Sequence, residues 1–203
     1  MPDWSARVSV VFQKNTPTFM KVYRSAINYL WGDIIEKDIP LKRLDYKYVI
    51  SSRLVYECFH YLNRDRCNES LVDISGIQLD ENLIIMERME YLQHDTQTSV
   101  YARSNLISTY KTLMKIDTYG GLLTGVFHIH PGKGPESIRP SVTDINDQMR
   151  REKVGMKAIG AIFSRDGFFR FFSKELGINI EIVGKGVKKH DRHLYQLENT
   201  CNL

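Results

Sequence analysis

The chain has 203 residues, of which 42% are hydrophobic and 26% are charged, and its formal net charge is +4. This composition is ordinary for a soluble globular protein, and the length suits one domain with extensions better than two full domains. The positive residues are scattered up to the basic stretch 185–193, so the charge gives no support to nucleic-acid binding.

Cysteines and apolar runs indicate the compartment. Cys58, Cys67 and Cys201 have no CxxC spacing, which predicts neither a disulfide framework nor a cysteine-based metal site. No apolar run approaches the roughly 20 residues of a membrane-spanning helix. The first residues make a poor signal peptide, because Asp3 is acidic and no long apolar segment follows. We therefore expect a cytoplasmic protein that binds neither membrane nor nucleic acid.

Residues 1–44 are predicted to form a small β-α extension packed on the main domain. Residues 6–12 alternate between apolar and polar side chains, as a strand does. After Pro17, residues 19–30 have helical periodicity with a proline near the helix start. No chemistry can be inferred from this segment.

Residues 45–184 are predicted to form one α/β domain. The apolar run 122–129 is typical of a central strand buried on both faces. Asp166-Gly167 is a strong hairpin signal. Further strands are expected over 46–50, 69–79, 81–92, 158–163, 168–173 and 178–183, and helices over 51–62, 104–116 and from 141 towards 151. The polar residues 185–203 are expected to be a tail outside the domain.

The predicted central strand contains two histidines at i and i+2. His128 and His130 therefore project to one face and can reach one ion at the Zn–N distance of roughly 2.0–2.1 Å. Ser141 and Asp144 lie three apart in the first turn of the next helix and share a face. Asp144 would complete two histidines plus one carboxylate and leave a fourth position open for water, which is typical of a catalytic zinc.

Each fragment also has a simpler explanation. His-x-His is frequent by chance, and Ser141 with Asp144 is a good helix N-cap box, which contributes about 1 kcal/mol and no chemistry. Glu69, which the sequence offers as a base, could equally be an exposed carboxylate at a strand edge. The succession of strand, Gly/Pro-rich loop and helix start makes coincidence less plausible, and capping is compatible with metal binding.

Together these residues resemble the JAMM (MPN+) metallopeptidase family, whose pattern is a Glu, then His-x-His-Pro, then Pro-Ser-x-x-Asp. The pattern is present here as Glu69, residues 128–131 and residues 140–144, with Gly125 before the first histidine and Gly76 seven residues after the Glu, where the family's strand ends. The resemblance covers about residues 45–183. It implies a JAMM/MPN-like, cytidine-deaminase-like fold: a central mixed β-sheet flanked by helices.

The chain departs from the family pattern in two places. Ile129 stands between the histidines, where the family commonly has Ser, and its side chain should point away from the metal. The loop from His130 to Ser141 has ten residues against the usual seven, which costs only about 0.3 kcal/mol of chain closure but lengthens a segment beside the cleft. Glu57 is the alternative base, although it is predicted to lie in the middle of a helix.

The resemblance implies one zinc ion per chain, held by His128, His130 and Asp144. Glu69 would take a proton from water and pass it to the leaving amine, and Ser141 would donate to the oxyanion, a contribution of about 3 kcal/mol. The implied reaction is cleavage of a peptide or isopeptide bond after the C-terminal Gly of a ubiquitin-like protein, in precursor processing or deconjugation. Only Gly lets an extended tail approach the metal so closely.

The compact chain is also similar to bacterial members of the family that accompany ubiquitin-like conjugation genes, some of them in antiphage operons. Expected partners are thus a ubiquitin-like protein and its conjugates, and ubiquitin-activating or -conjugating enzymes. Three alternatives stay open. They are a non-catalytic scaffold of the same fold, a metallopeptidase for a small peptide or carrier-protein tail, and a DNA-repair-like relative, for which no basic groove is evident.

Overall fold

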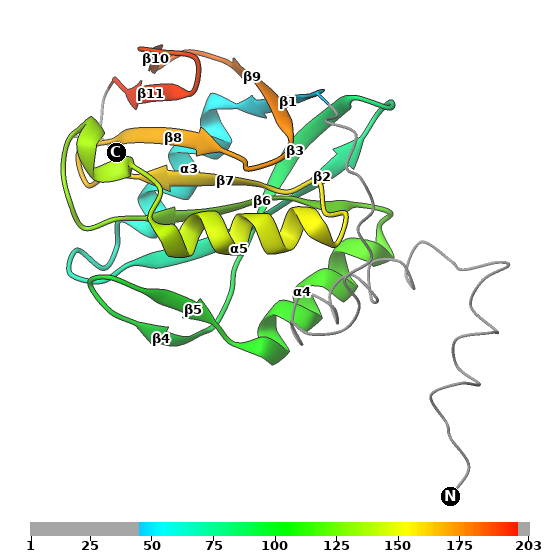
Figure 1. Cartoon of the computed structure of the whole chain (residues 1–203), viewed down its shortest axis with the longest axis horizontal. Helices are drawn as coiled ribbons and strands as arrows, with labels where there is room; N and C mark the ends of the chain where they lie inside the picture. Colours follow the sequence, from blue (N-terminus) through cyan, green and yellow to red (C-terminus); the bar gives the residue numbers. More distant parts are fainter. Residues whose placement is uncertain (1–44, 199–203) are drawn as a thin grey trace, which may run out of the picture.

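A computed structural model describes residues 45–198 as a nine-stranded mixed sheet with helices on both faces (Figure 1). The predicted β-α unit over residues 1–44 lies outside the described residues. The strand order is β10-β11-β8-β7-β6-β2-β3-β1-β9. The bounds of these strands are β1 Asp45–Ser51, β2 Ser70–Gln78, β3 Leu83–Glu90, β6 Leu122–Ile129, β7 Ile159–Phe163, β8 Phe168–Phe172, β9 Gly177–Val183, β10 Val187–Lys189 and β11 Leu194–Leu197. The predicted α/β class, with a central mixed sheet flanked by helices, is confirmed.

Strand β6 is the middle strand of the sheet, as its apolar sequence predicts. It pairs antiparallel with β2 and parallel with β7. The prediction that both its faces are buried is only half right. Phe127 and Ile129 are fully buried on one face, whereas Val126 and His128 on the other face keep part of their surface exposed. That second face lines a cleft, so β6 is at once a core strand and a wall of the functional site.

Helix α3, Ser52–Leu62, covers the face of the sheet that carries the main core (Figure 1). Its N-cap is Ser51, whose hydroxyl accepts the backbone N–H of Leu54 at 3.1 Å. Its apolar side chains recur with the helical period, so one stripe packs on the strands. This stripe comprises Leu54, Val55, Cys58, Phe59 and Leu62, all buried against side chains of β1, β2, β6 and β7.

Helices α4, Leu106–Thr118, and α5, Val142–Lys153, lie on the opposite face. Helix α5 buries polar rather than apolar side chains. Gln148 donates to the carbonyl of Ala158 at 2.8 Å, and the Glu152 carboxylate accepts two backbone N–H groups that follow β8. A cleft lies between α4 and α5 above the sheet. None of the described helices is both long and apolar enough to cross a membrane.

Three features differ from the sequence-based expectation. A two-stranded sheet of β4, His94–Gln97, and β5, Ala102–Ser104, lies beside the start of β2 and was not predicted. The loop after β6 contains a short 3-10 helix, Pro135–Ile138. The expected C-terminal tail is wrong for residues 187–197, because β10 and β11 extend the sheet and bury Tyr195 and Leu197. In these two strands apolar and polar residues alternate over only three or four positions. Such a short pattern is not recognisable within a basic segment of the sequence.

Candidate metal centre

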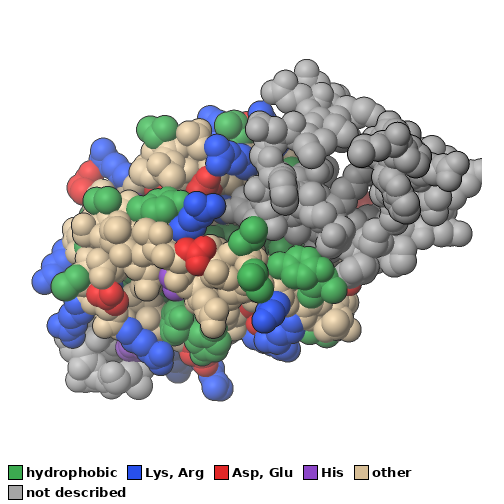
Figure 2. Space-filling model, turned by 90° about the horizontal axis from the view of Figure 1, so that it is seen from below, with side chains coloured by type: hydrophobic (Ala, Val, Ile, Leu, Met, Phe, Trp, Pro, Cys, Tyr) green, Lys and Arg blue, Asp and Glu red, His purple; other side chains and the backbone are tan. Residues whose placement is uncertain are grey.

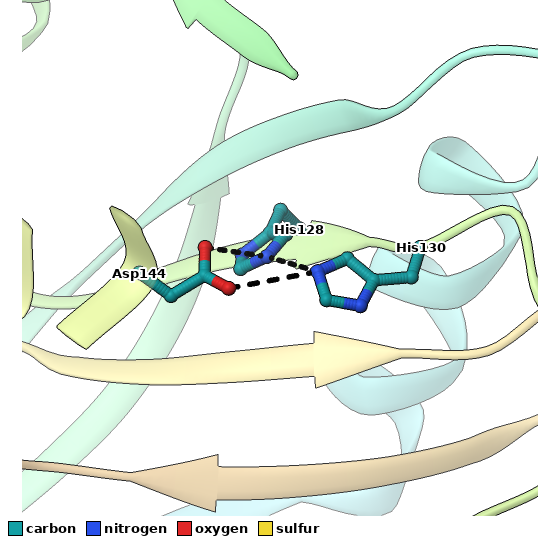
Figure 3. A group of neighbouring side chains, drawn as sticks. All are labelled: His128, His130 and Asp144. Carbon is teal, nitrogen blue, oxygen red and sulfur yellow. Dashed lines mark hydrogen bonds and ion pairs between the residues drawn. The ribbon is translucent and has the colours of Figure 1, made fainter. Parts of the chain in front are cut away.

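Three side chains from two distant parts of the chain converge at the end of β6. His128 lies in β6 and His130 one residue after its end, their side chains point to the same side, and Asp144 lies in the first turn of α5 (Figure 3). The Nε2 atoms of the two histidines are 3.1 Å apart. The carboxylate oxygens of Asp144 lie 3.2 Å from Nε2 of His128 and 3.7 Å from Nε2 of His130. All three side chains are about 85% buried.

These separations fit a tetrahedral metal site. Ligands at the roughly 2.0–2.1 Å bond length of Zn–N and Zn–O define tetrahedron edges of about 3.3 Å. The three distances bracket that value, and the residues offer two imidazole nitrogens and one carboxylate oxygen as ligands. The donor set suits zinc and leaves room for one further ligand. The predicted convergence of His128, His130 and Asp144 is confirmed.

A backbone carbonyl orients the second histidine. Nδ1 of His130 lies 2.7 Å from the carbonyl oxygen of Ser137, which belongs to the 3-10 helix in the loop after β6. A proton on Nδ1 donates to this carbonyl and leaves the Nε2 lone pair free for a metal. Ile138 is fully buried against Ile162 and Phe172, so the lengthened loop is anchored where it makes this contact.

The capping box at the start of α5 fixes the carboxylate ligand. Oδ2 of Asp144 accepts the backbone N–H of Ser141 at 2.7 Å, and Oγ of Ser141 accepts the backbone N–H of Asp144 at 3.2 Å. Burial alone would raise the pKa of Asp144, but the hydrogen bonds from His128 and His130 outweigh it and lower the pKa. Burial lowers the pKa of His130, but its hydrogen bonds with Asp144 and with the Ser137 carbonyl outweigh this effect and raise the pKa. Capping and metal binding are thus compatible in one side chain.

Glu69 lies at the edge of the triad. Its Oε1 is 3.9 Å from Nε2 of His130, and its side chain is 12% exposed. Burial is the largest influence on its pKa, which is raised even though the two histidines lower it. A carboxyl with a raised pKa that faces a metal site is more basic than an exposed one and is suited to accept a proton and release it later. Glu57 is far less suitable, because it pairs with Arg53 on the exposed side of α3, across the sheet.

The segment before Glu69 is held by a residue that the sequence pattern did not single out. Arg165, in the turn between β7 and β8, donates to the carbonyl of Asn68 at 2.7 Å and to Oδ1 of Asn63 at 3.1 Å. The N–H of Glu69 itself donates to the carbonyl of Thr98 in the β4–β5 hairpin, at 2.7 Å. The backbone at Asn68 and Glu69 is therefore held by two partners, Arg165 and Thr98, which are each more than 25 residues away in the sequence.

A cleft of about 700 Å³ begins at the metal centre and continues between α4 and α5 over β2 and β6. Ser141, which is exposed, lines its mouth together with Glu69. Its deeper part contains two charged residues that the sequence pattern did not single out, Asp73 of β2 and Arg151 of α5. The sequence did contain a signal for Asp73. It is a carboxyl residue in a mainly apolar strand, and its even spacing from Glu69 places both side chains on one face. Figure 2 views the molecule from the side of α4 and the hairpin, where charged and hydrophobic side chains are interspersed.

Comparisons with known proteins add little to this geometry. No protein-family model matches the chain, and no curated protein matches its sequence. A solution structure from Desulfitobacterium hafniense is 15% identical, with a TM-score of 0.48 over 66% of this chain and 94% of that chain. A JAB1/MPN domain protein from Archaeoglobus fulgidus is 16% identical, with a TM-score of 0.43 over 66% of this chain and 98% of that chain. At such values the likeness carries no conclusion on family or chemistry.

Proposed function

We infer that this chain is a zinc-dependent metallopeptidase of the JAMM type, which cleaves after the C-terminal Gly of a ubiquitin-like protein. The observation that supports it most is the approach of His128, His130 and Asp144 to within 3.1–3.7 Å of one another, with a buried carboxyl beside them. Structural zinc sites are closed by four protein ligands, so such a site would need neither the carboxyl of Glu69 nor an open cleft beside the metal.

The chain's own residues supply the proton transfers and the positioning. A zinc ion in this site would contribute Lewis acidity and a water acidified to a pKa of about 7. Glu69 is placed to take a proton at Oε1 and to return it to the leaving amine. The Ser141 hydroxyl accepts the N–H of Asp144, so its own proton can be donated towards a carbonyl oxygen in the cleft.

The substrate part of the proposal is supported by the motif and by the shape of the cleft. A space of about 700 Å³ beside the β4–β5 hairpin can receive several residues of an extended chain. An extended tail can pair with a strand edge at such a place. Glycines at the end of that tail would let its backbone approach the largely buried candidate ligands.

The test combines metal analysis with cleavage. The purified chain should contain about one zinc, and it should cleave a ubiquitin-like precursor fusion in a reaction that a chelator abolishes and zinc restores. Glu69→Gln should keep the zinc and lose turnover by at least about a hundredfold. The matched control is Glu57→Gln, on the far face of the sheet, which should leave turnover unchanged.

Other outcomes assign the alternatives. Cleavage of short peptides but not of the fusion would favour the small-substrate enzyme. Zinc without any turnover, or turnover unaffected by Glu69→Gln, would refute the proposed mechanism and favour the scaffold or another base. Loss of zinc from His128→Ala or Asp144→Ala would identify that residue as a ligand; an unchanged zinc content would exclude it.

A further inference from the structure

Deep in the cleft lies a carboxyl group that the proposed reaction does not use. Asp73 is in β2, four residues after Glu69 and on the same face of the strand. It is only 4% exposed, and what remains accessible of it opens into the cleft. Among residues 45–198, no side chain or N–H group makes a hydrogen bond or an ion pair within 4 Å to this carboxyl. Asp73 is thus nearly fully buried, has no partner within residues 45–198, and is directed into the same cavity as the metal centre.

The charged groups around Asp73 do not compensate for its burial. Burial raises the pKa of Asp73 to about 7, although the positive charge of Arg151 opposes the rise; Glu90 adds to it. Arg151 is bonded to Oε1 of Gln148 at 3.1 Å, on α5 itself. Glu90 is engaged by Ser75, Lys115 and Tyr119. A carboxyl left in this state destabilises the fold, and such groups are concentrated at functional sites.

The floor of the cleft between the metal centre and Asp73, formed by β2 and β6, is apolar. Leu71 lies opposite His128 in the ladder of β2 and β6, and Asp73 lies opposite Val126, two residues further along. Two residues of a strand span about 7 Å. Leu113 of α4, Met156 after α5 and Phe172 of β8 add apolar walls, and Asp147 and Arg150 of α5 also line the cleft. An apolar passage of this length that ends in a carboxylate matches a methylene chain with a cationic tip.

We propose that Asp73 forms the end of a specificity subsite that binds a lysine or arginine side chain of the substrate, close to the bond cleaved at the metal centre. The basic group would donate to the Asp73 carboxylate, and its methylene groups would pack on Leu71 and Val126. The subsite rests on the proposed function for its link to cleavage, but its affinity for a cation does not depend on turnover.

The binding experiment uses small probes and the zinc-loaded full chain. Nα-acetyl-lysine amide and Nα-acetyl-norleucine amide have the same stem and differ in the ammonium group. NMR titration, followed through the ¹³C signal of the Asp73 carboxyl, should show the lysine probe binding about tenfold more tightly, since a charge-assisted hydrogen bond forms. Asp73→Asn should reduce this preference to about twofold or less. Equal binding of the two probes by the natural chain, or an undiminished preference in Asp73→Asn, would overturn the proposal.

A cleavage experiment separates the failure of the subsite from the failure of the proposed function. Peptides with lysine, norleucine or glutamate at each position flanking the bond are compared by mass spectrometry. The expected result is a preference for lysine at one position, with KM about tenfold higher in Asp73→Asn and kcat little changed. Cleavage without any basic preference would exclude the subsite and keep the peptidase. Binding of the lysine probe without cleavage of any peptide would keep the subsite and exclude the peptidase.

Discussion

Nδ1 of His130 and the carbonyl oxygen of Ser137 lie 2.7 Å apart. The loop that follows β6 therefore orients the imidazole of His130, one of the candidate metal ligands. The loop's three additional residues relative to the JAMM pattern therefore do not leave it detached from the site. It is anchored by Ile138 in a small apolar cluster and by Asp166, which accepts the N–H of Gly134 at 2.9 Å. Zinc affinity should accordingly depend on a side chain that never touches the metal.

Ile138→Ala should raise the zinc dissociation constant about tenfold. The substitution removes a buried anchor, so the Ser137 carbonyl can no longer hold the imidazole of His130 in place, and groups of this kind typically affect affinity 10–100-fold. Competition with a chromophoric chelator measures the effect. Glu136→Ala, in the same 3-10 helix but exposed, is the control and should change nothing. Unaltered affinity in Ile138→Ala would mean that the carbonyl is held by other contacts.

Arg165→Ala should lower kcat about tenfold and move the acid limb of the rate profile to higher pH. Arg165 holds the carbonyl of Asn68, and its charge lowers the pKa of Glu69. The pKa of Glu69 is already above its ordinary value, and loss of the positive charge of Arg165 raises it further. Glu69 is active as a base only when it is deprotonated. Activity would then disappear at a higher pH as the solution is acidified.

The pH profile distinguishes this positioning role from a general loss of structure. Zinc content should stay unchanged in Arg165→Ala, and Arg165→Lys should restore the position of the acid limb in part, because it keeps the charge but loses the fork-like geometry. Arg66→Ala removes an exposed arginine nearby and should leave the profile as it is. An acid limb that does not move in Arg165→Ala would refute the electrostatic part of this prediction.

Asp73→Asn should stabilise the protein at alkaline pH. The native pKa of about 7 lies above the ordinary value of 3.8, so the folded state binds more protons than the unfolded state between these pH values. Stability therefore falls as pH rises from about 4 to 7 and stays lower above 7. A shift of about three units corresponds to roughly 4 kcal/mol at most.

Urea denaturation at pH 4 and pH 8 measures this difference. The variant should exceed the natural chain by roughly 2–4 kcal/mol at pH 8 and by little at pH 4. Glu87→Gln, at an exposed position on the neighbouring strand β3, should show no such pH dependence. If Asp73→Asn is less stable than the natural chain at pH 8, the carboxylate has a partner that compensates for its burial.

Gly76→Ala should lower the free energy of unfolding by about 3 kcal/mol. Gly76 does not end its strand, as the family pattern suggested, but lies within β2 where the register to β3 shifts between Ser75 and Gly76. A methyl group there would collide with the backbone carbonyl of Ile85, which cannot move without breaking the ladder. Gly121→Ala is a milder comparison, since the new methyl group mainly meets the ring of the partly exposed Tyr119. Thermal unfolding of both variants would test this, and equal loss in both would contradict it.

The sequence by itself predicted the elements whose patterns are local. The periods of the core strands and helices, the Asp-Gly hairpin and the capping box each depend on neighbours within a few residues. The two candidate ligand histidines belong to this group, because alternation along extended backbone places His128 of β6 and His130, one residue after its end, on the same face. Asp144 could be added because helical geometry and the N-cap box act within a single turn.

Only the tertiary structure decided which groups surround that site. The position of the Ser137 carbonyl, the Arg165 contact to Asn68 and the burial of Asp73 all depend on how separate segments of the described chain pack together. The two short strands at the C-terminus and the β4–β5 hairpin likewise form only against strands that are already in place. Burial and hydrogen-bond partners are properties of the packed chain, and no local pattern of residue types determines them.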